Sequence, residues 1–346
     1  MAIIDKPSDY FNTKLYTGNG GTQSITGVGF QPDFNWTKSR TTTQSHVLTD
    51  AVRGVTKTLF TNATQAEATL SGITAFGTDG YTLGASDLWS ENSASFASWN
   101  WKANGSGSAN TDGSINSTVS ANTTAGFSIA TWTTPSSGTQ FTIGHGLGQA
   151  PGMMIMKCTS QANSWFTYHQ GLGGNVNDYL ILDASAAEAS QTNMWGANGA
   201  QTNTMGFKAG TSSYTNEPMI GYFFAEKQGY SKFLSYVGNG NDNGTFVYTG
   251  FKPSFVMIKR TNSTASWLMF DNKRANPFNE ITADLRADLN NAEDASTSYN
   301  NIDFLSNGFK IRKSNADINA SGGTYIYMAI AENPFVASNF NAATAR

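Results

Sequence analysis

The residues that could catalyse a reaction are few and widely spaced in this sequence. A glutamate recurs after alanine at Glu67, Glu188 and Glu293. A glycoside hydrolase needs two carboxyl groups at a set separation in one cleft, and no second acid recurs beside these three. We therefore interpret the glutamates as structural hydrogen-bond acceptors. No nucleophile is paired with a base in a recognisable pattern, so the sequence predicts no catalytic residue and no enzyme.

Two glycine-rich stretches could suggest a bound ion or phosphate. NGNDNG (239–244) is similar to the start of a calcium loop, but the twelfth position, which must be acidic, is Gly250. GHGLGQ (144–149) precedes a strand-like run instead of a helix, so no helix dipole would face a phosphate. The lone Cys158 offers neither a disulfide nor a metal site. We predict turns at both stretches, and neither a metal nor a cofactor.

The composition limits the possible partners. Only 13% of the 346 residues are charged and the formal net charge is -3, whereas an average globular protein has about 25% charged residues. No basic stripe is present to bind nucleic acid. No window approaches the roughly 20 apolar residues of a membrane span. The N-terminal MAIIDKPSDYF lacks the regions of a signal peptide, which predicts synthesis in the cytoplasm.

The elements that would position these residues are repeated three times. Each copy has a proline, then a lysine six residues later, then a ring eight residues beyond the lysine, and an aspartate or histidine four further on. The prolines are Pro32, Pro151 and Pro253; the lysines are Lys38, Lys157 and Lys259; the rings are His46, Trp165 and Trp267; the last position holds Asp50, His169 and Asp271. Several anchors at fixed offsets indicate one unit of roughly 100 residues in three tandem copies.

The repeat explains two of the histidines. His46 occupies a ring position that tryptophan fills in the other copies, which favours packing over catalysis. His169 stands where the other copies have aspartate. We expect this position to orient a neighbouring turn by hydrogen bonding, and contact with a ligand is the alternative.

Within a copy, short apolar and aromatic runs alternate with clusters of Gly, Asn, Asp and Ser, which is typical of strands and turns. We predict an all-β fold of three tandem antiparallel β-sandwich units, jelly-roll or lectin-like in shape. The units are residues 1–104 with an N-terminal segment, 105–229 with a linker, and 230–346 with a C-terminal tail. The N-terminal segment and the tail are expected to lie outside the repeated core, where either could dock to a partner.

Four local predictions follow. SFVMIKR (254–260) does not alternate, so it is expected to be a central strand covered on both faces. FLSYV and TFVYTGF flank Asn-Gly pairs that favour a hairpin. Residues 278–294 are interpreted as a strand plus a short helical turn, with Leu285 and Leu289 four apart. INSTV (115–119) in the linker is a candidate edge strand.

The candidate contact residues are two tryptophans in loops where the copies differ. Trp89 lies in SDLWSENS (86–93), and Trp195 lies in NMWGANGAQTN (193–203). A tryptophan in a polar loop can dock sugar or protein. The alternative is that each ring folds back over its own sandwich.

These residues together resemble a known domain. The run YTGNG…ITGVGFQPDF…SHVLTDAVRG…AEAT…FGTDGYTLG…FASWNWKA is similar to a repeated domain of virion proteins from tailed bacteriophages, especially phages of marine bacteria. The resemblance extends over residues 8–335. The second copy departs most, with Gly146-Leu147 in place of Gly-Phe and His169 in place of aspartate.

The resemblance implies a non-enzymatic structural protein on the particle surface, in a tail fibre or similar appendage, with host attachment as a further role. The implied partners are other virion proteins, a host surface glycan or receptor, and further copies of the chain in a homo-oligomer. A capsid-decorating protein, a free carbohydrate-binding, lectin-like protein and a glycan-cleaving enzyme with a facing acid pair remain the alternatives. A repeated sandwich would extend a spike or cover a shell.

Overall fold

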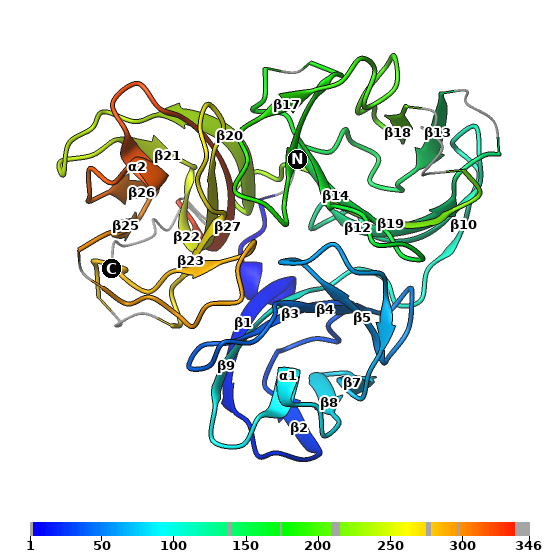
Figure 1. The fold of residues 1–346 in the computed structure, drawn as a ribbon, viewed down its shortest axis with the longest axis horizontal. Helices are drawn as coiled ribbons and strands as arrows, with labels where there is room; N and C mark the ends of the chain where they lie inside the picture. Colours follow the sequence, from blue (N-terminus) through cyan, green and yellow to red (C-terminus); the bar gives the residue numbers. More distant parts are fainter. Residues whose placement is uncertain are drawn as a thin grey trace.

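The computed structural model describes residues 3–136, 140–173, 175–208, 215–274, 278–296 and 298–335. The chain is all-β, with 44% of residues in strands and 3% in helices. Its strands form several antiparallel sheets. Figure 1 shows three lobes around a common centre, and each lobe comes from a consecutive third of the chain. No helix among the described residues is both long enough and apolar enough to cross a membrane.

The first set of strands follows the short 3-10 helix η1 (Pro7–Asp9). It comprises β1 (Phe11–Thr17), β2 (Gln23–Thr26), β3 (Phe34–Ser39), β4 (Val47–Asp50), β5 (Lys57–Phe60), β6 (Ala68–Thr69), β7 (Ile73–Gly77), β8 (Gly80–Leu83) and β9 (Ser95–Trp101), with helix α1 (Asp87–Ser90) before β9. The large sheet has the order β1-β9-β3-β4-β5-β6, and the small sheet has the order β2-β8-β7.

The second set comprises β10 (Ser108–Asn110), β11 (Ser117–Asn122), β12 (Phe127–Thr133), β13 (Phe141–Gly144), β14 (Met153–Cys158), β15 (Phe166–His169), β16 (Asp178–Ile181), β17 (Ala189–Ser190), β18 (Thr204–Phe207) and β19 (Pro218–Phe224). Its large sheet has the order β10-β11-β12-β19-β14-β15-β16-β17, and β13 pairs with β18. The segment proposed as an edge strand (115–119) enters a strand at Ser117, but β11 is not at the edge: it pairs with β12 on one side and with β10 on the other, and β10 is the edge strand.

The third set comprises β20 (Ser231–Val237), β21 (Phe246–Tyr248), β22 (Phe251–Arg260), β23 (Leu268–Asp271), β24 (Leu285–Arg286), β25 (Ile302–Leu305), β26 (Gly308–Ile311) and β27 (Thr324–Pro334), with α2 (Ala316–Asn319) before β27. Its sheets have the orders β20-β27-β22-β23-β24 and β21-β26-β25. The three large sheets therefore share the same order of five equivalent strands. These are β1-β9-β3-β4-β5 in the first set, β12-β19-β14-β15-β16 in the second and β20-β27-β22-β23-β24 in the third.

The buried hydrophobic residues that the structure describes form four clusters. Three of them each belong to one set of strands. The fourth collects residues from all three sets, including Phe34, Tyr222 and Phe255, at the centre of the molecule. Each large sheet is thus covered on one face by its own set and on the other by its neighbours. The repeats surround one core instead of forming a row, so they do not lengthen the chain into a spike.

The central strand of the third set is confirmed. β22 lies between β27 and β23. Phe255 and Met257 join the central cluster, whereas Val256 and Ile258 join the cluster of the third set. All four side chains are at most 2% exposed. The non-alternating pattern predicted this double burial, because a strand covered on both faces needs apolar residues on both.

Three local expectations are wrong. FLSYV and TFVYTGF do not form a hairpin, because β20 pairs with β27 while β21 pairs with β26 in the other sheet. Of the strand and helical turn expected at residues 278–294, all of them described, the strand is present as β24, but no helix is, because pairing of Leu285 and Arg286 with β23 overrides the helical spacing. The N-terminal segment does not lie outside the core: Ile4 is 7% exposed and joins the central cluster. Residues 336–346 of the tail lie outside the described residues.

Candidate functional site

The three sets meet at junctions that repeat the same backbone hydrogen bond. The amide of each recurring glutamate donates to a carbonyl of the next set. Glu67 donates to Thr159, Glu188 to Thr261 and Glu293 to Arg40, and the nitrogen-to-oxygen distance is 2.8 Å in each case. The third set thereby returns to the first, and the arrangement closes on itself. We call these contacts junctions 1–2, 2–3 and 3–1.

The ring of the repeat lies at each junction. Trp165 donates from Nε1 to the carbonyl of Phe60 at 2.7 Å, and Trp267 donates to that of Ile181 at 2.9 Å. His46 takes this place in junction 3–1, fully buried and stacked on Trp99 at 6.5 Å between ring centroids. Burial lowers the pKa of His46 well below its usual value, which keeps the imidazole neutral. The expected packing role agrees with this environment.

The recurring lysines are fully buried near the same junctions. Lys157 donates from Nζ to the carbonyl of Thr64 in the first set at 2.9 Å, and Lys259 donates to that of Ser185 in the second set at 3.3 Å. Lys38 donates to carbonyls of its own loop. Burial lowers the pKa of each lysine to about 8. The lysines therefore fasten main-chain loops and are not available to a ligand.

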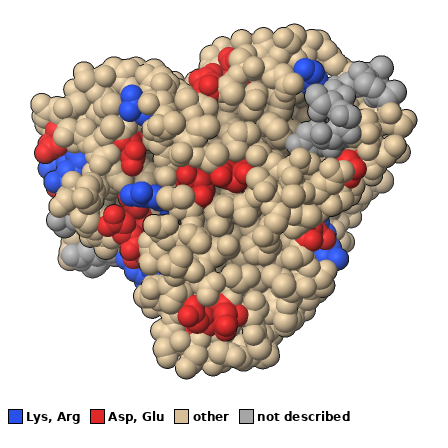
Figure 2. Space-filling view, in the orientation of Figure 1, with Lys and Arg blue, Asp and Glu red and all other residues tan. Residues whose placement is uncertain are grey.

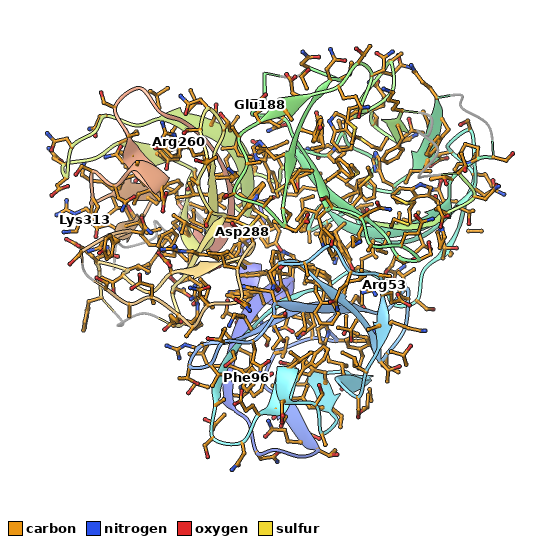
Figure 3. The ribbon with its side chains drawn as sticks, viewed as in Figure 1. Arg53, Phe96, Glu188, Arg260, Asp288 and Lys313 are labelled. Carbon is orange, nitrogen blue, oxygen red and sulfur yellow. The ribbon has the colours of Figure 1, made fainter. Side chains whose placement is uncertain are left out.

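Junction 1–2 contains a buried charged group. Arg53 donates from Nε to Asp50 Oδ2 at 2.6 Å and from Nη1 to Glu67 Oε2 at 3.0 Å. Tyr222 of the second set donates its hydroxyl to Asp50 Oδ2 at 2.8 Å. The side chain of Arg53 is 5% exposed and that of Asp50 is fully buried. Figure 3 shows Arg53 at the boundary of the first two lobes.

Junction 3–1 repeats this chemistry with a different ring. Arg274 donates from Nε to Asp271 Oδ2 at 2.5 Å and from Nη1 to Glu293 Oε2 at 3.0 Å. Trp99 of the first set donates to Asp271 Oδ2 at 3.0 Å, where Tyr222 does so in junction 1–2. Arg40 adds two hydrogen bonds to Glu293. The recurring glutamate is thus an acceptor, as expected, and its partners are arginines at two of the junctions.

Junction 2–3 keeps the backbone but lacks the charged group. His169 accepts at Nδ1 from the amide of Gly171 at 2.9 Å, and its Nε2 lies 3.0 Å from the carbonyl oxygen of Tyr327 in the third set. His169 therefore orients its turn, as Asp50 and Asp271 do. Burial lowers the pKa of His169 to about 4, so the ring is neutral at pH 7.

The other members of the group change together with His169. Leu172 stands three residues after it, where Asp50 and Asp271 are followed by arginine. Met328 pairs with Met257 as Tyr222 pairs with Ile155, so methionine replaces the ring. Glu188 is left without an arginine partner among the described residues, and burial raises its pKa. Figure 3 places Glu188 at the boundary of the second and third lobes.

A hollow of about 530 Å³ opens beside the charged group of junction 1–2. The first set contributes two residues to its lining and the second set contributes the rest: Arg53 and Glu67, then Ala109, Asn116, Ser117, Thr118, Thr131, Trp132, Thr133, Thr159, Pro218 and Met219. Strands β10 and β11 build its outer wall. In the described chain, neither of the other sets has strands at this edge of its large sheet. We take this hollow as the candidate functional site.

The described lining of the hollow contains a single carboxyl group. Glu67 carries the one carboxyl group among its described lining residues, with 19% of the side chain exposed. Lys57, 3.5 Å away, and Arg53 both pair with that carboxylate. A facing acid for glycoside hydrolysis is therefore missing from the described lining. Four nearby charged side chains, Asp50, Arg53, Lys57 and Glu67, sum to zero. No group of three His, Cys, Asp or Glu in the described chain could hold a metal ion.

Trp89 and Trp195 are not part of the hollow. Both are 0% exposed. Trp89 packs in the cluster of the first set, and Trp195 packs in that of the second, where its Nε1 donates to the carbonyl of Asp178 at 2.7 Å. An indole without exposed surface cannot stack on a ligand in this conformation. The structure favours the alternative in which each ring covers its own sheets.

Sequence reasoning missed the residues of the hollow. Arg53 could have been found, because arginine follows the repeated aspartate by three residues in two copies, at Arg53 and Arg274. Thr118, Thr131 and Thr133 carried no signal in so threonine-rich a chain.

The comparisons with known proteins give a family without a function. A family model described as a domain of unknown function, DUF7483, matches residues 6–334. The chain belongs to this family. No curated protein and no solved structure matches it. The matched region runs through all three sets of strands, so the family pattern includes every junction.

Proposed function

We propose that this chain is a non-enzymatic structural protein on the surface of a tailed-bacteriophage particle, in a tail fibre or similar appendage, where it also contacts the host. The resemblance of the repeated segments to phage virion proteins supports this proposal. The closed arrangement carries it further: three repeats bury one shared core and join through the same backbone hydrogen bond. Such an arrangement gives a rigid body with a large outer surface.

The proposal includes a finer description of the fold. The three sets are three copies of an antiparallel β-sandwich, jelly-roll or lectin-like, over residues 1–104, 105–229 and 230–346. The shared order of the large sheets supports this, as does a separate hydrophobic cluster within each set.

The proposed location is the virion, after synthesis in the host cytoplasm, with other virion proteins as partners. Because the repeats close within one chain, an appendage would gain length from contacts between chains, which supports a homo-oligomer. Uncharged residues cover most of the face in Figure 2. Contacts on this face would therefore depend more on shape and hydrogen bonds than on charge.

Gold-labelled antibody against the purified chain tests the proposal by electron microscopy of intact particles. We expect label on the tail appendage, and particles that lack the protein should adsorb poorly to host cells. Label on the capsid with normal adsorption would replace the appendage by a decorating role. Particles free of the protein by both labelling and mass spectrometry would refute the virion assignment.

The hollow at junction 1–2 favours one second candidate, a free carbohydrate-binding protein. Its largely polar lining, in which Arg53 and Glu67 pair with each other, suits a sugar whether or not the chain is part of a particle. The same labelling experiment separates the two, since a free protein would remain in the supernatant when particles are sedimented.

A further inference from the structure

We propose that the hollow at junction 1–2 binds a neutral saccharide. This inference names the ligand class for host contact and in that sense rests on the proposed function, although binding itself needs only the folded chain. The volume, about 530 Å³, lies in the usual range of small-ligand sites, roughly 300–1,000 Å³.

The wall of the hollow presents adjacent hydroxyl groups. Thr118 of β11 lies directly opposite Thr131 of β12, and Thr133 lies two residues further on the same face. Thr118 and Thr133 are exposed and Thr131 is half-buried. None of the three side chains makes a hydrogen bond with another described residue, so the hydroxyls can donate to and accept from a ligand. Sugars match such a wall, because their own hydroxyls do both.

The floor of the hollow selects against anionic ligands. The guanidinium of Arg53 uses its donors on Asp50, Glu67, the carbonyl of Leu48 and the hydroxyl of Tyr222. It has little capacity left for a phosphate or carboxylate. The carboxylate of Glu67 is partly exposed and can accept from two neighbouring sugar hydroxyls. A neutral polyol therefore fits better than an anion.

Affinity should be modest. Trp132, the aromatic residue among the described lining, is 4% exposed, so no ring face is available for sugar stacking. Hydrogen bonds of this kind exchange with water, and we expect a Kd on the order of 1 mM for a short oligosaccharide. Many copies on one particle would raise the effective affinity by multivalency.

Saturation-transfer NMR on the purified full chain tests the ligand class. The probes are a panel of neutral mono- and oligosaccharides, with sialylated and sulfated sugars and inorganic phosphate as comparators. We expect saturation transfer to at least one neutral sugar and weaker transfer to the anions. Binding of the anions alone, or of no neutral sugar at about 50 mM, would overturn the inference.

Variants locate the bound sugar. Thr118→Val with Thr133→Val removes two hydroxyls and keeps β-branched side chains, and we expect binding to weaken about tenfold. Ala109→Leu places bulk in the hollow and should have a similar effect. Thr26→Val, at an exposed threonine of β2 in the first set, is the matched control and should bind as the unmodified chain does. Equal affinity in all three variants would place the sugar elsewhere and refute the assignment of the hollow.

The two proposals fail separately. Sugar binding by a chain that is absent from particles would refute the virion role and leave the hollow assigned. A chain found on particles that binds no neutral sugar would do the reverse. Comparing a free sugar with the intact host polysaccharide in the same assay shows which of the two sources supplies the ligand.

Discussion

Junctions 1–2 and 2–3 have the same backbone and different chemistry. In junction 1–2 a buried aspartate, an arginine and a tyrosine hydroxyl form one hydrogen-bonded group. In junction 2–3 the same three places hold His169, Leu172 and Met328. The amide-to-carbonyl bond between sets is nevertheless 2.8 Å long in both.

The comparison separates what holds the sets together from what varies between them. The constant parts are the backbone bond, the tryptophan that donates to a neighbouring carbonyl, and the apolar centre. In junction 2–3 all three residues of the charged group are replaced together, which agrees with the free energy of buried ion pairs. A buried ion pair contributes little against an apolar replacement of similar volume, but removal of one partner alone is costly.

The largest expected effect comes from breaking the group at one residue. Asp50→Ala removes a buried carboxylate that pairs with Arg53, whose side chain is 5% exposed. The same change removes the acceptor of the Tyr222 hydroxyl. We expect the free energy of unfolding, measured in urea, to fall by about 3–5 kcal/mol. Asp9→Ala is the control, because the Lys6–Asp9 pair has the same spacing but is exposed, and it should lose less than about 1 kcal/mol. Equal losses would show that burial does not set the cost.

Replacing the whole group should cost less than breaking it. The triple change Asp50→His, Arg53→Leu and Tyr222→Met copies junction 2–3 into junction 1–2. We expect the unfolding free energy of the triple variant to be at least about 2 kcal/mol higher than that of Asp50→Ala. The triple variant removes both Asp50 and Arg53, and the remaining charge, that of Glu67, keeps Lys57 as its partner. A triple variant less stable than the single one would mean that the three residues do not act as a unit.

Acid should protonate His169 of junction 2–3 at a higher pH than the carboxylate of Asp271 in junction 3–1. The folded pKa of His169 is about 4 and its unfolded value is about 6.5. Between these values the unfolded chain binds a proton that the folded chain does not, so stability falls as the pH drops from 6.5 to 4. Burial would raise the pKa of Asp271, but Arg274 and backbone donors lower it below 3.8 overall. The contribution of Asp271 is therefore lost only below about pH 3.8.

His169→Gln isolates this effect. Lowering the pH from 6.5 to 4.5 should reduce the unfolding free energy of the unmodified chain by about 2–3 kcal/mol more than that of the variant. The other histidines titrate in both chains and cancel in the difference. Parallel pH profiles for the two chains would show that the His169 ring already takes up its proton in the folded state.

The sequence predicted the elements better than their arrangement. Fixed offsets from Pro32, Pro151 and Pro253 identified equivalent strands, and the non-alternating run at 254–260 predicted burial on both faces. The sequence could not show that one face of this strand is covered by the neighbouring sets. An apolar face has the same composition whether it packs within a unit or between units. Helical spacing at Leu285 and Leu289 misled for a related reason, because strand pairing at the sheet edge decides that segment.

The candidate site was less accessible to sequence reasoning. Trp89 and Trp195 have polar neighbours in the sequence, which suggested exposed loops, yet each ring reaches back into its own core. The hollow arises where β10 and β11 extend one large sheet beside Arg53 of another set. Residues as far apart in the sequence as Arg53 and Met219 form it, and no local pattern records their proximity.

The smallest expected effect concerns a single hydrogen bond that, in the part of the chain the structure describes, only junction 3–1 has. Thr61, Leu182 and Ala287 occupy the same place in the three sets, since each donates its amide to the carbonyl of His46, Trp165 or Trp267. The hydroxyl of Thr61 also donates to the carbonyl of Ala287 in the third set at 2.8 Å, and both residues are fully buried. Leucine and alanine cannot make this bond.

Thr61→Val should therefore lower the unfolding free energy by about 1 kcal/mol, because it removes the hydroxyl and leaves a buried carbonyl with one donor fewer. Thr58→Val is the matched control on β5: its buried hydroxyl has no partner among the described residues, so its loss should be neutral or stabilising. Urea unfolding of both variants measures the difference. If the two substitutions change stability equally, packing alone accounts for Thr61, and this hydrogen bond does not distinguish the stability of junction 3–1 from that of the other two.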